Sequence, residues 1–182
     1  MRSSGSAVLK FRLIARLDIR NERLIKTVRL EGVRPVGDPG EYARRYDAEG
    51  IDELLYLDVV ASLYGRNALA DLVSRAVESV FVPITVGGGI RSVEDVRALL
   101  LTGADKIAIN TAAIKRPELI TEIAEKFGSQ AITVQIDAKR KGQGWEAYCE
   151  GGRQPTGRDA VEWAQEAVDR GSGEILLTSI DR

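Results

Sequence analysis

The sequence predicts an α/β fold, namely an incomplete (βα)8 TIM barrel that contains strands one to six of eight. Two observations support this prediction. Short runs rich in Val, Ile and Leu alternate with charged segments of helical length, an alternation typical of parallel strands joined by crossover helices. The chain also carries an internal repeat with four βα units before it restarts, which is the size of a half-barrel.

We expect each apolar run to form one strand. These predicted strands are 11–18, 53–58, 82–86, 106–110, 131–136 and 174–179. The helices between them are predicted at 40–49, 67–79, 93–102, 117–127 and 159–170. Their ends carry recognisable signals: Ser92 and Asp95 form a capping pattern, Pro117 suits a first helical turn, and Gly103 and Gly128 suit C-caps. After the fifth strand, the glycines on either side of 145–149 predict a small hairpin.

The repeat links two distant segments of the chain. The pattern Asp, Glu, aromatic, Ala, Gly, Glu begins at Asp38 and recurs from Asp159, 121 residues later. The strand before each copy ends in an aspartate, Asp18 and Asp137, 119 residues apart. The second copy lacks a seventh and eighth strand, so we expect a fragment whose unpaired apolar edges favour aggregation or need a partner.

Composition predicts an ordinary globular domain at 11–182, preceded by a flexible segment at 1–10. Of 182 residues, 26 are Lys or Arg and 27 are Asp or Glu, which implies no general affinity for nucleic acid or anionic membrane. With no apolar run of the ~18 residues that span a bilayer and no signal peptide, we expect a cytoplasmic protein. The chain has one cysteine, Cys149, and no histidine. We therefore expect no metal or cofactor, and proton transfer by carboxylates, Lys, Tyr or Cys149.

Asp18 and Asp137 are the candidate catalytic residues. Catalytic groups of these barrels lie at the carboxyl ends of strands, and the first and fifth strands face each other across the barrel mouth. One base and one acid could therefore act on a substrate between them. Alternatively, each aspartate caps the following loop or pairs with Arg20 or Lys139. The repeat favours a functional role, because capping does not readily explain why an aspartate ends the equivalent strand in both copies.

A glycine-rich loop predicts a phosphate site. Gly87, Gly88 and Gly89 follow the third strand and open a helix, so their N–H groups can approach an anion. Asn110 and Thr111 end the neighbouring fourth strand and could supply side-chain donors. Three glycines alone fit a tight turn equally well. The glycine loop and the Asn110-Thr111 pair on adjacent βα units together are a stronger indication of a phosphate site.

Other polar residues near the predicted mouth are weaker candidates for substrate binding. Asp58 and Asp181 close the second and sixth strands, although either could simply anchor a loop. Lys26, in a long loop after the first strand, could meet a second phosphate, although an exposed lysine is usually only solvated. Lys139, beyond Asp137, joins this group. Cys149 has no histidine to activate it, so we do not expect it to be catalytic.

Charged residues also begin four strands, at the opposite end of the predicted barrel. They are Arg12, Glu53, Lys106 and Glu174. A ring of two cations and two anions at this end is usually structural. It could also gate a passage through the barrel.

These motifs resemble the cyclase subunit of imidazole glycerol phosphate synthase. The resembling segments are LDIRNERLIK (17–26), GIDELLYLDVVAS (50–62), PITVGGGIRS (83–92), GADKIAINTAA (103–113), PELITEIAEKFGSQA (117–131), IDAKR (136–140) and GEILLTSIDR (173–182). The sister isomerase of the pathway shares the two aspartates and the glycine loop, but the segments INTAA, FGSQA and LLTSIDR look like the cyclase. The resemblance covers the chain from about residue 11 and implies a ribulose-phosphate-binding barrel.

The resemblance implies a lyase that acts in histidine biosynthesis, which is part of amino-acid biosynthesis. Ammonia from a glutaminase (a glutamine amidotransferase partner) would convert phosphoribulosyl-formimino aminoimidazole carboxamide ribonucleotide to imidazole glycerol phosphate and aminoimidazole carboxamide ribonucleotide. It implies that Asp18 and Asp137 are general base and acid and that Gly89, Asn110 and Thr111 hold one phosphate. Lys26 would lie in the substrate loop, and the four-residue ring would form the ammonia gate. The family's second phosphate site falls in the missing region.

Three alternatives stay open. Lys26-Thr-Val-Arg-Leu and Val36-Gly-Asp-Pro also resemble paralogues associated with amidation of surface sugars, although these often lose the first aspartate. A second alternative is a non-catalytic scaffold that docks a glutaminase and passes ammonia to another enzyme. The third is a fragment with no activity of its own.

Overall fold

The computed structural model describes residues 11–28, 31–59 and 67–181. The segment 1–10, which we expect to be flexible, lies outside these residues. No helix in the described ranges combines the length and apolarity needed to cross a membrane.

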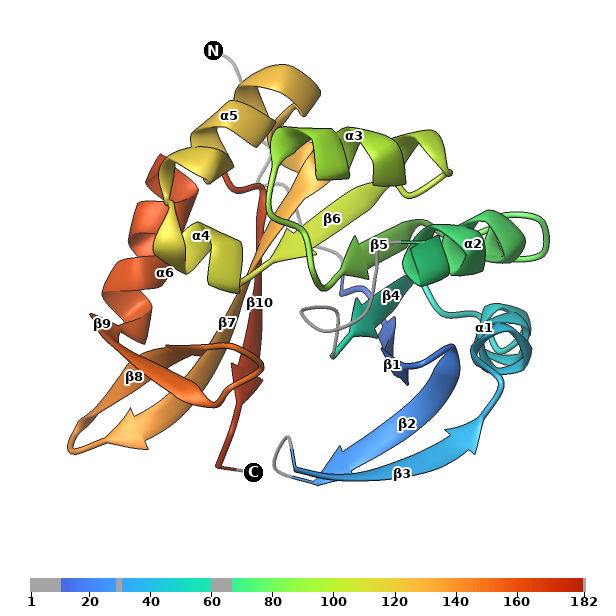
Figure 1. Ribbon diagram of the computed structural model, residues 1–182, viewed down its shortest axis with the longest axis horizontal. Coiled ribbons are helices and arrows are strands. Elements are labelled where there is room, and N and C mark those ends of the chain that lie inside the picture. The colour runs from blue at the N-terminus through green and yellow to red at the C-terminus, as the bar shows by residue number, and fades with distance from the viewer. Residues whose placement is uncertain (1–10, 29–30, 60–66, 182) are drawn as a thin grey trace, which may run out of the picture.

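Six parallel strands form the centre of the fold, which confirms the predicted incomplete barrel (Figure 1). Each pairs with the strand that follows it among the six. In order they are β1 (Ile14–Arg20), β4 (Glu53–Asp58), β5 (Ile84–Gly87), β6 (Lys106–Ile109), β7 (Ile132–Lys141) and β10 (Glu174–Ser179). The first strand starts three residues later than predicted, since Phe11 is fully exposed and lies before the β1–β4 pairing.

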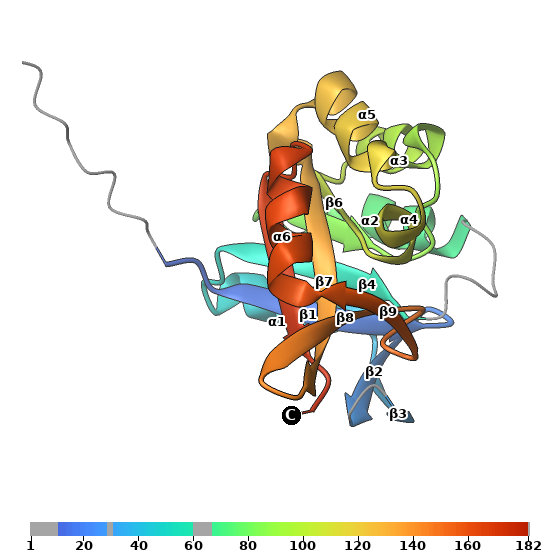
Figure 2. The same ribbon diagram turned by 90° about the vertical axis from the view of Figure 1, so that its left-hand side faces the viewer.

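Helices cover the outer face of this sheet (Figures 1 and 2). They are α1 (Pro39–Ala48), α2 (Asn67–Ala76), α3 (Val93–Leu101), α4 (Thr111–Lys115), α5 (Glu118–Phe127) and α6 (Ala160–Asp169), with a 3-10 turn, η1 (Ser129–Ala131). The predicted Ser92–Asp95 capping box is present. The repeat-related Asp38 and Asp159 cap α1 and α6 by accepting bonds from backbone N–H groups. The repeat therefore marks equivalent helix starts.

Two antiparallel hairpins extend from the carboxyl ends of β1 and β7 (Figure 1). The predicted second hairpin consists of the end of β7, β8 (Gly144–Cys149) and β9 (Gln154–Asp159). The prediction of a long loop after the first strand is wrong. Two antiparallel strands, β2 (Arg23–Val28) and β3 (Glu31–Gly37), form a ribbon there. Asn21 and Glu22, both with positive φ, turn the chain between β1 and β2, as paired left-handed residues do in tight hairpins.

The sheet is curled so that its first and last parallel strands face each other. No backbone pairing joins β1 to β10 within the described ranges. Side chains nevertheless bridge them, because Arg12, just before β1, contacts Glu174 and Arg16 contacts Thr178. The inner face of the sheet therefore encloses one interior, while the large apolar core lies between the sheet and the helices.

Candidate active site

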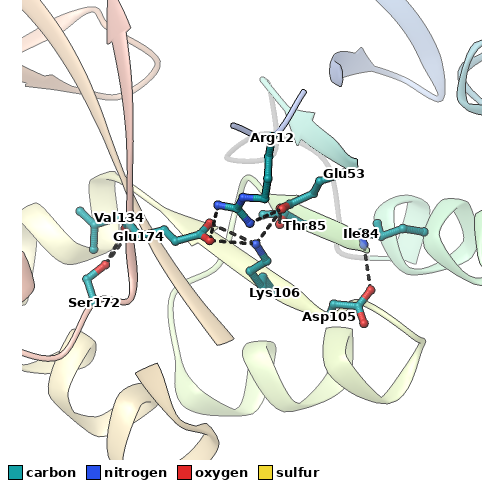
Figure 3. Close-up of polar contacts among 9 residues, drawn as sticks. All are labelled: Arg12, Glu53, Ile84, Thr85, Asp105, Lys106, Val134, Ser172 and Glu174. Carbon is teal, nitrogen blue, oxygen red and sulfur yellow. Dashed lines mark hydrogen bonds and ion pairs between the residues drawn. The ribbon is translucent and has the colours of Figure 1, made fainter. Parts of the chain in front are cut away.

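A charged ring forms the amino-terminal end of the interior (Figure 3). Glu53 Oε2 accepts from Arg12 Nη1 at 3.0 Å and from Lys106 Nζ at 2.8 Å. Glu174 accepts from Arg12 Nη2 at 2.7 Å and from Lys106 Nζ at 3.1 Å. Thr85 Oγ1 donates to the second oxygen of Glu53 at 2.5 Å. The structure thus brings together all four residues predicted for the ring.

The ring is ionic and partly withdrawn from water. The Glu53 side chain is 3% exposed and that of Lys106 is 12% exposed, whereas Arg12 lies at the edge at 45%. Burial disfavours the Glu174 carboxylate, but hydrogen bonds from Arg12 and Lys106 outweigh it and lower the pKa of Glu174. The hydrogen bond to Glu174 raises the pKa of Arg12. Both shifts favour the charged forms of Arg12 and Glu174, and ion pairs among the four side chains close the ring.

An apolar layer lies next to the ring. On three strands, the residue two positions after a ring member faces the same side of the sheet. These residues are Leu55, Ala108 and Leu176, and they pack together with Leu57 in a small cluster separate from the main core. The interior therefore changes from charged to apolar along the strands before the polar mouth begins.

Asp137 is a buried acid at the mouth. It is 1% exposed, and its Oδ1 accepts from Gln135 Nε2 and its Oδ2 from Asn110 Nδ2, both at 2.9 Å. Burial raises the pKa of Asp137, although these donors and the charge of Arg16 oppose the increase. Asp18 also acts on this group by charge repulsion. Neutral amides thus hold both oxygens, and burial is the larger effect on the pKa of the group.

Asp18 has a different environment. Its Oδ1 accepts from Arg16 Nε at 2.8 Å, and its side chain is 16% exposed. Arg16 Nη1 also donates to Thr178 Oγ1 at 2.9 Å, and Thr178 is the direct β10 neighbour of Asp137. Among the described contacts, Asp18 pairs with Arg16 rather than with Arg20, the partner considered above. The two aspartates therefore share one mouth, and the Arg16 guanidinium reaches from β1, the strand of Asp18, to β10, the strand next to β7.

The glycine loop lies directly beside the end of β4. Gly87 pairs with Leu57, and Gly88 has a φ of 107° and passes so close to the Asp58 carbonyl that a Cβ there would overlap it. Gly89 also has a positive φ, of 68°. The backbone therefore requires glycine at 88, and Asp58 lies beside the loop.

Asn110 and Thr111 make contacts that sequence reasoning did not predict. The Asn110 amide donates to Asp137 and, at 3.2 Å, to the Tyr148 carbonyl. Thr111 Oγ1 accepts from the backbone N–H of Glu150 at 2.9 Å. Both residues lie beside the second hairpin. In this arrangement they support Asp137 and the hairpin.

The remaining predicted site residues lie at the periphery of the mouth. Lys26 is exposed on β2, in the first hairpin. The Lys139 ammonium lies 6.0 Å from the centre of the Tyr148 ring. Asp181 Oδ2 accepts from the backbone N–H of Arg140 at 2.7 Å, which anchors the chain after β10. No described contact brings these three residues to the two acids.

Sequence reasoning missed Arg16, Gln135 and Thr178. A signal for the first two was present: alternate residues of a strand face the same side, so residues two before Asp18 and Asp137 must share the interior with them. Arg16 and Gln135 are also repeat-related, 119 residues apart. Thr178 stands four residues after Glu174 on one strand, so the same alternation places it in the interior, whereas its contact with Arg16 depends on how the sheet curls.

Comparison with known proteins relates the chain to proteins of histidine biosynthesis. A family model described as "Histidine biosynthesis protein" matches residues 12–182. Proteins named imidazole glycerol phosphate synthase subunit HisF are 59% identical in Legionella pneumophila, 54% in Myxococcus xanthus and 53% in Pyrococcus furiosus. These matches cover 94–96% of this chain and, in the same order, 81%, 69% and 69% of the relatives.

Proposed function

The chain belongs to the HisF family of imidazole glycerol phosphate synthase subunits, and from this premise we propose the role of each part of the site. The protein is the cyclase, a lyase that uses ammonia to close the imidazole ring in histidine biosynthesis. Its substrate is phosphoribulosyl-formimino aminoimidazole carboxamide ribonucleotide. The products are imidazole glycerol phosphate and aminoimidazole carboxamide ribonucleotide, and the reaction takes place in the cytoplasm.

The unequal environments of the two acids are the observation that carries this proposal. Asp137 is buried, accepts bonds from neutral donors and has a raised pKa, as suits a general acid. Asp18 is ion-paired and more exposed, as suits a carboxylate that accepts a proton. Pairs of titratable groups in contrasting environments are typical of acid–base sites. Asp18 therefore acts as base and Asp137 as acid on a substrate between them.

The glycine loop is the proposed site of one substrate phosphate. Gly88 and Gly89 adopt positive φ between β5 and the capped start of α3. Backbone N–H groups in such a turn can converge on an anion. Lys26, Lys139, Asp58, Asp181 and Thr111 are proposed contacts around the rest of the substrate; of these, Lys26 lies on a hairpin that borders the mouth.

The charged ring is the proposed entrance for ammonia. It lies at the end of the interior opposite the acids, and the apolar layer separates the two. An apolar interior carries the neutral ammonia molecule more readily than ammonium, because burying an unpaired charge is costly. The partner at this end would be a glutaminase that releases ammonia against the ring.

The experiment is turnover with an ammonium salt as nitrogen source, which bypasses the glutaminase. We expect the unaltered protein to form both products. Asp18→Asn and Asp137→Asn should each lower kcat by about 10²–10⁴-fold, with unchanged circular dichroism. Wild-type rates in both variants would refute the assignment of the acids. Stimulation of a glutaminase without any cyclase turnover would instead favour the scaffold role.

A further inference from the structure

Arg16 is a charged residue in the interior that neither the motifs nor the proposed mechanism uses. It faces the same side of β1 as Asp18, and its side chain is only 25% exposed. One end of its guanidinium donates to Asp18 at 2.8 Å and the other to Thr178 at 2.9 Å. A planar guanidinium presents its donors in a fixed fork. These two bonds therefore fix its plane between β1 and β10.

The equivalent position in the repeat holds a different donor. Gln135 stands two residues before Asp137 as Arg16 stands two before Asp18, and each donates at 2.8–2.9 Å to the aspartate that follows. One acid thus receives a charged donor and the other a neutral amide. The charge of Arg16 also acts on Asp137, where it opposes the increase in pKa caused by burial. A single side chain therefore influences both acids.

We propose that Arg16 is a positioning residue for the cyclase reaction, which holds the Asp18 carboxylate in place by tying it across the interior to Thr178. The inference rests on the function proposed above. Because Thr178 pairs with Asp137 in the parallel register, the tie sets the placement of the base relative to the strand pair that carries the acid. Displacing a reacting group by about 1 Å can cost about 10²-fold in rate.

Two substitutions separate the charge of Arg16 from its geometry. Arg16→Gln installs the residue that the repeat places before Asp137. We expect it to lower kcat about 10–100-fold while KM changes by less than about threefold. It should also move the basic limb of the kcat–pH profile to higher pH, because losing the nearby cation leaves the pKa of Asp137 higher. Arg16→Lys keeps the charge but not the fork, so it should recover the pH profile and only part of kcat.

Thr178→Val is the isosteric test of the tie. It removes only the hydroxyl that accepts from Arg16 and leaves the Arg16–Asp18 pair, so we expect kcat to fall about 3–10-fold. This variant keeps the proposal testable if Arg16→Gln does not fold. Arg45→Gln is the matched control, because Arg45 forms an equally short ion pair, with Glu49 on the exposed face of α1, and should leave kcat unchanged.

The outcomes distinguish this inference from the proposed function. Wild-type kcat and pH profile in Arg16→Gln and Thr178→Val, together with loss of turnover in Asp18→Asn, would overturn the positioning role alone. A rise in KM with unchanged kcat would also overturn it, since that result indicates direct substrate binding. Failure of the unaltered protein to turn over, or full activity of Asp18→Asn, would refute both the function and the role of Arg16.

Discussion

Burial of Asp137 serves the proposed chemistry at a cost to the stability of the fold. A carboxyl group whose pKa is raised in the folded state binds its proton more tightly there than in the unfolded chain. Below the unfolded value of ~3.9, both states are protonated and the cost is absent. As pH rises from there towards the folded pKa, stability falls. At neutral pH the fold is therefore less stable than it would be if position 137 held a group that does not ionise.

Asp137→Asn should raise the melting temperature at pH 7 while removing turnover, because a neutral amide does not ionise and so carries no such pH-dependent cost. The gain should disappear in melts at about pH 3, where the native carboxyl is itself protonated. Thermal unfolding followed by circular dichroism at both pH values measures the difference. Asp71→Asn, at an exposed position on α2, is the control and should show little change at either pH. A lower melting temperature for Asp137→Asn at pH 7 would contradict this account.

At the residue scale, the sequence predicted the two acids but not how each is held. Strand-end position and the repeat singled out Asp18 and Asp137. The amide of Asn110, assigned to a phosphate by its motif, donates to Asp137 in the structure. A motif names residues that lie close together. Which neighbour a short polar side chain contacts depends on ångström-scale placement of adjacent strands, which spacing along the chain does not specify.

At the element scale, substitution of Gly88 tests whether the glycine loop requires its left-handed backbone conformation. Gly88→Ala places a side chain at a φ of 107° and against the Asp58 carbonyl. Gly50→Ala meets the same kind of conformation, at a φ of 85°, with no atom within 4 Å of the added Cβ. We expect Gly50→Ala to lose about 1 kcal/mol of unfolding free energy and Gly88→Ala clearly more, because only the latter adds a backbone clash to the left-handed strain.

Urea unfolding of the two glycine variants measures this difference. Gly88→Ala should also weaken binding of inorganic phosphate, if the loop is the proposed phosphate site, whereas Gly50→Ala should not. Equal stability of the two variants would mean that the loop adjusts freely around Asp58.

The hairpins show why some elements were predictable and one was not. Glycines at 142 and 144 predict the turn after β7, because glycine readily adopts a left-handed conformation. The turn after β1 instead uses Asn21 and Glu22 at positive φ. Glutamate seldom adopts this conformation, so local sequence favours a loop there. Tertiary pairing of β2 with β1 and β3 overrides that preference.

At the scale of the whole molecule, the charged ring joins strands that are far apart in the chain. Glu53 receives bonds from Arg12, Lys106 and Thr85. Glu53→Gln should lower the free energy of unfolding by about 3 kcal/mol, because it leaves the largely buried Lys106 ammonium with less compensation. Chemical denaturation measures the loss. The control is Glu49→Gln, whose exposed, solvent-screened pair with Arg45 should contribute little to stability. Similar losses of unfolding free energy in both variants would contradict a stabilising role of the ring.

The order of the six parallel strands was predictable, and their curvature was not. Alternation and the repeat determine which segments are strands and that neighbours in sequence pair. The contacts of Arg12 with Glu174 and of Arg16 with Thr178 join the two ends of that order. They depend on how the twist accumulates over the whole sheet, a property that no local segment encodes.

The most direct test of the central claim, an unequal pair of acids at one mouth, is a ¹³C NMR titration of the aspartate carboxyl groups. The Asp137 signal is identified by its absence from the spectrum of Asp137→Asn. We predict that it titrates above the ~3.9 of an exposed aspartate, and that it moves higher still in Arg16→Gln. Titration of Asp137 at or below the ordinary value, with no response to Arg16, would contradict the account.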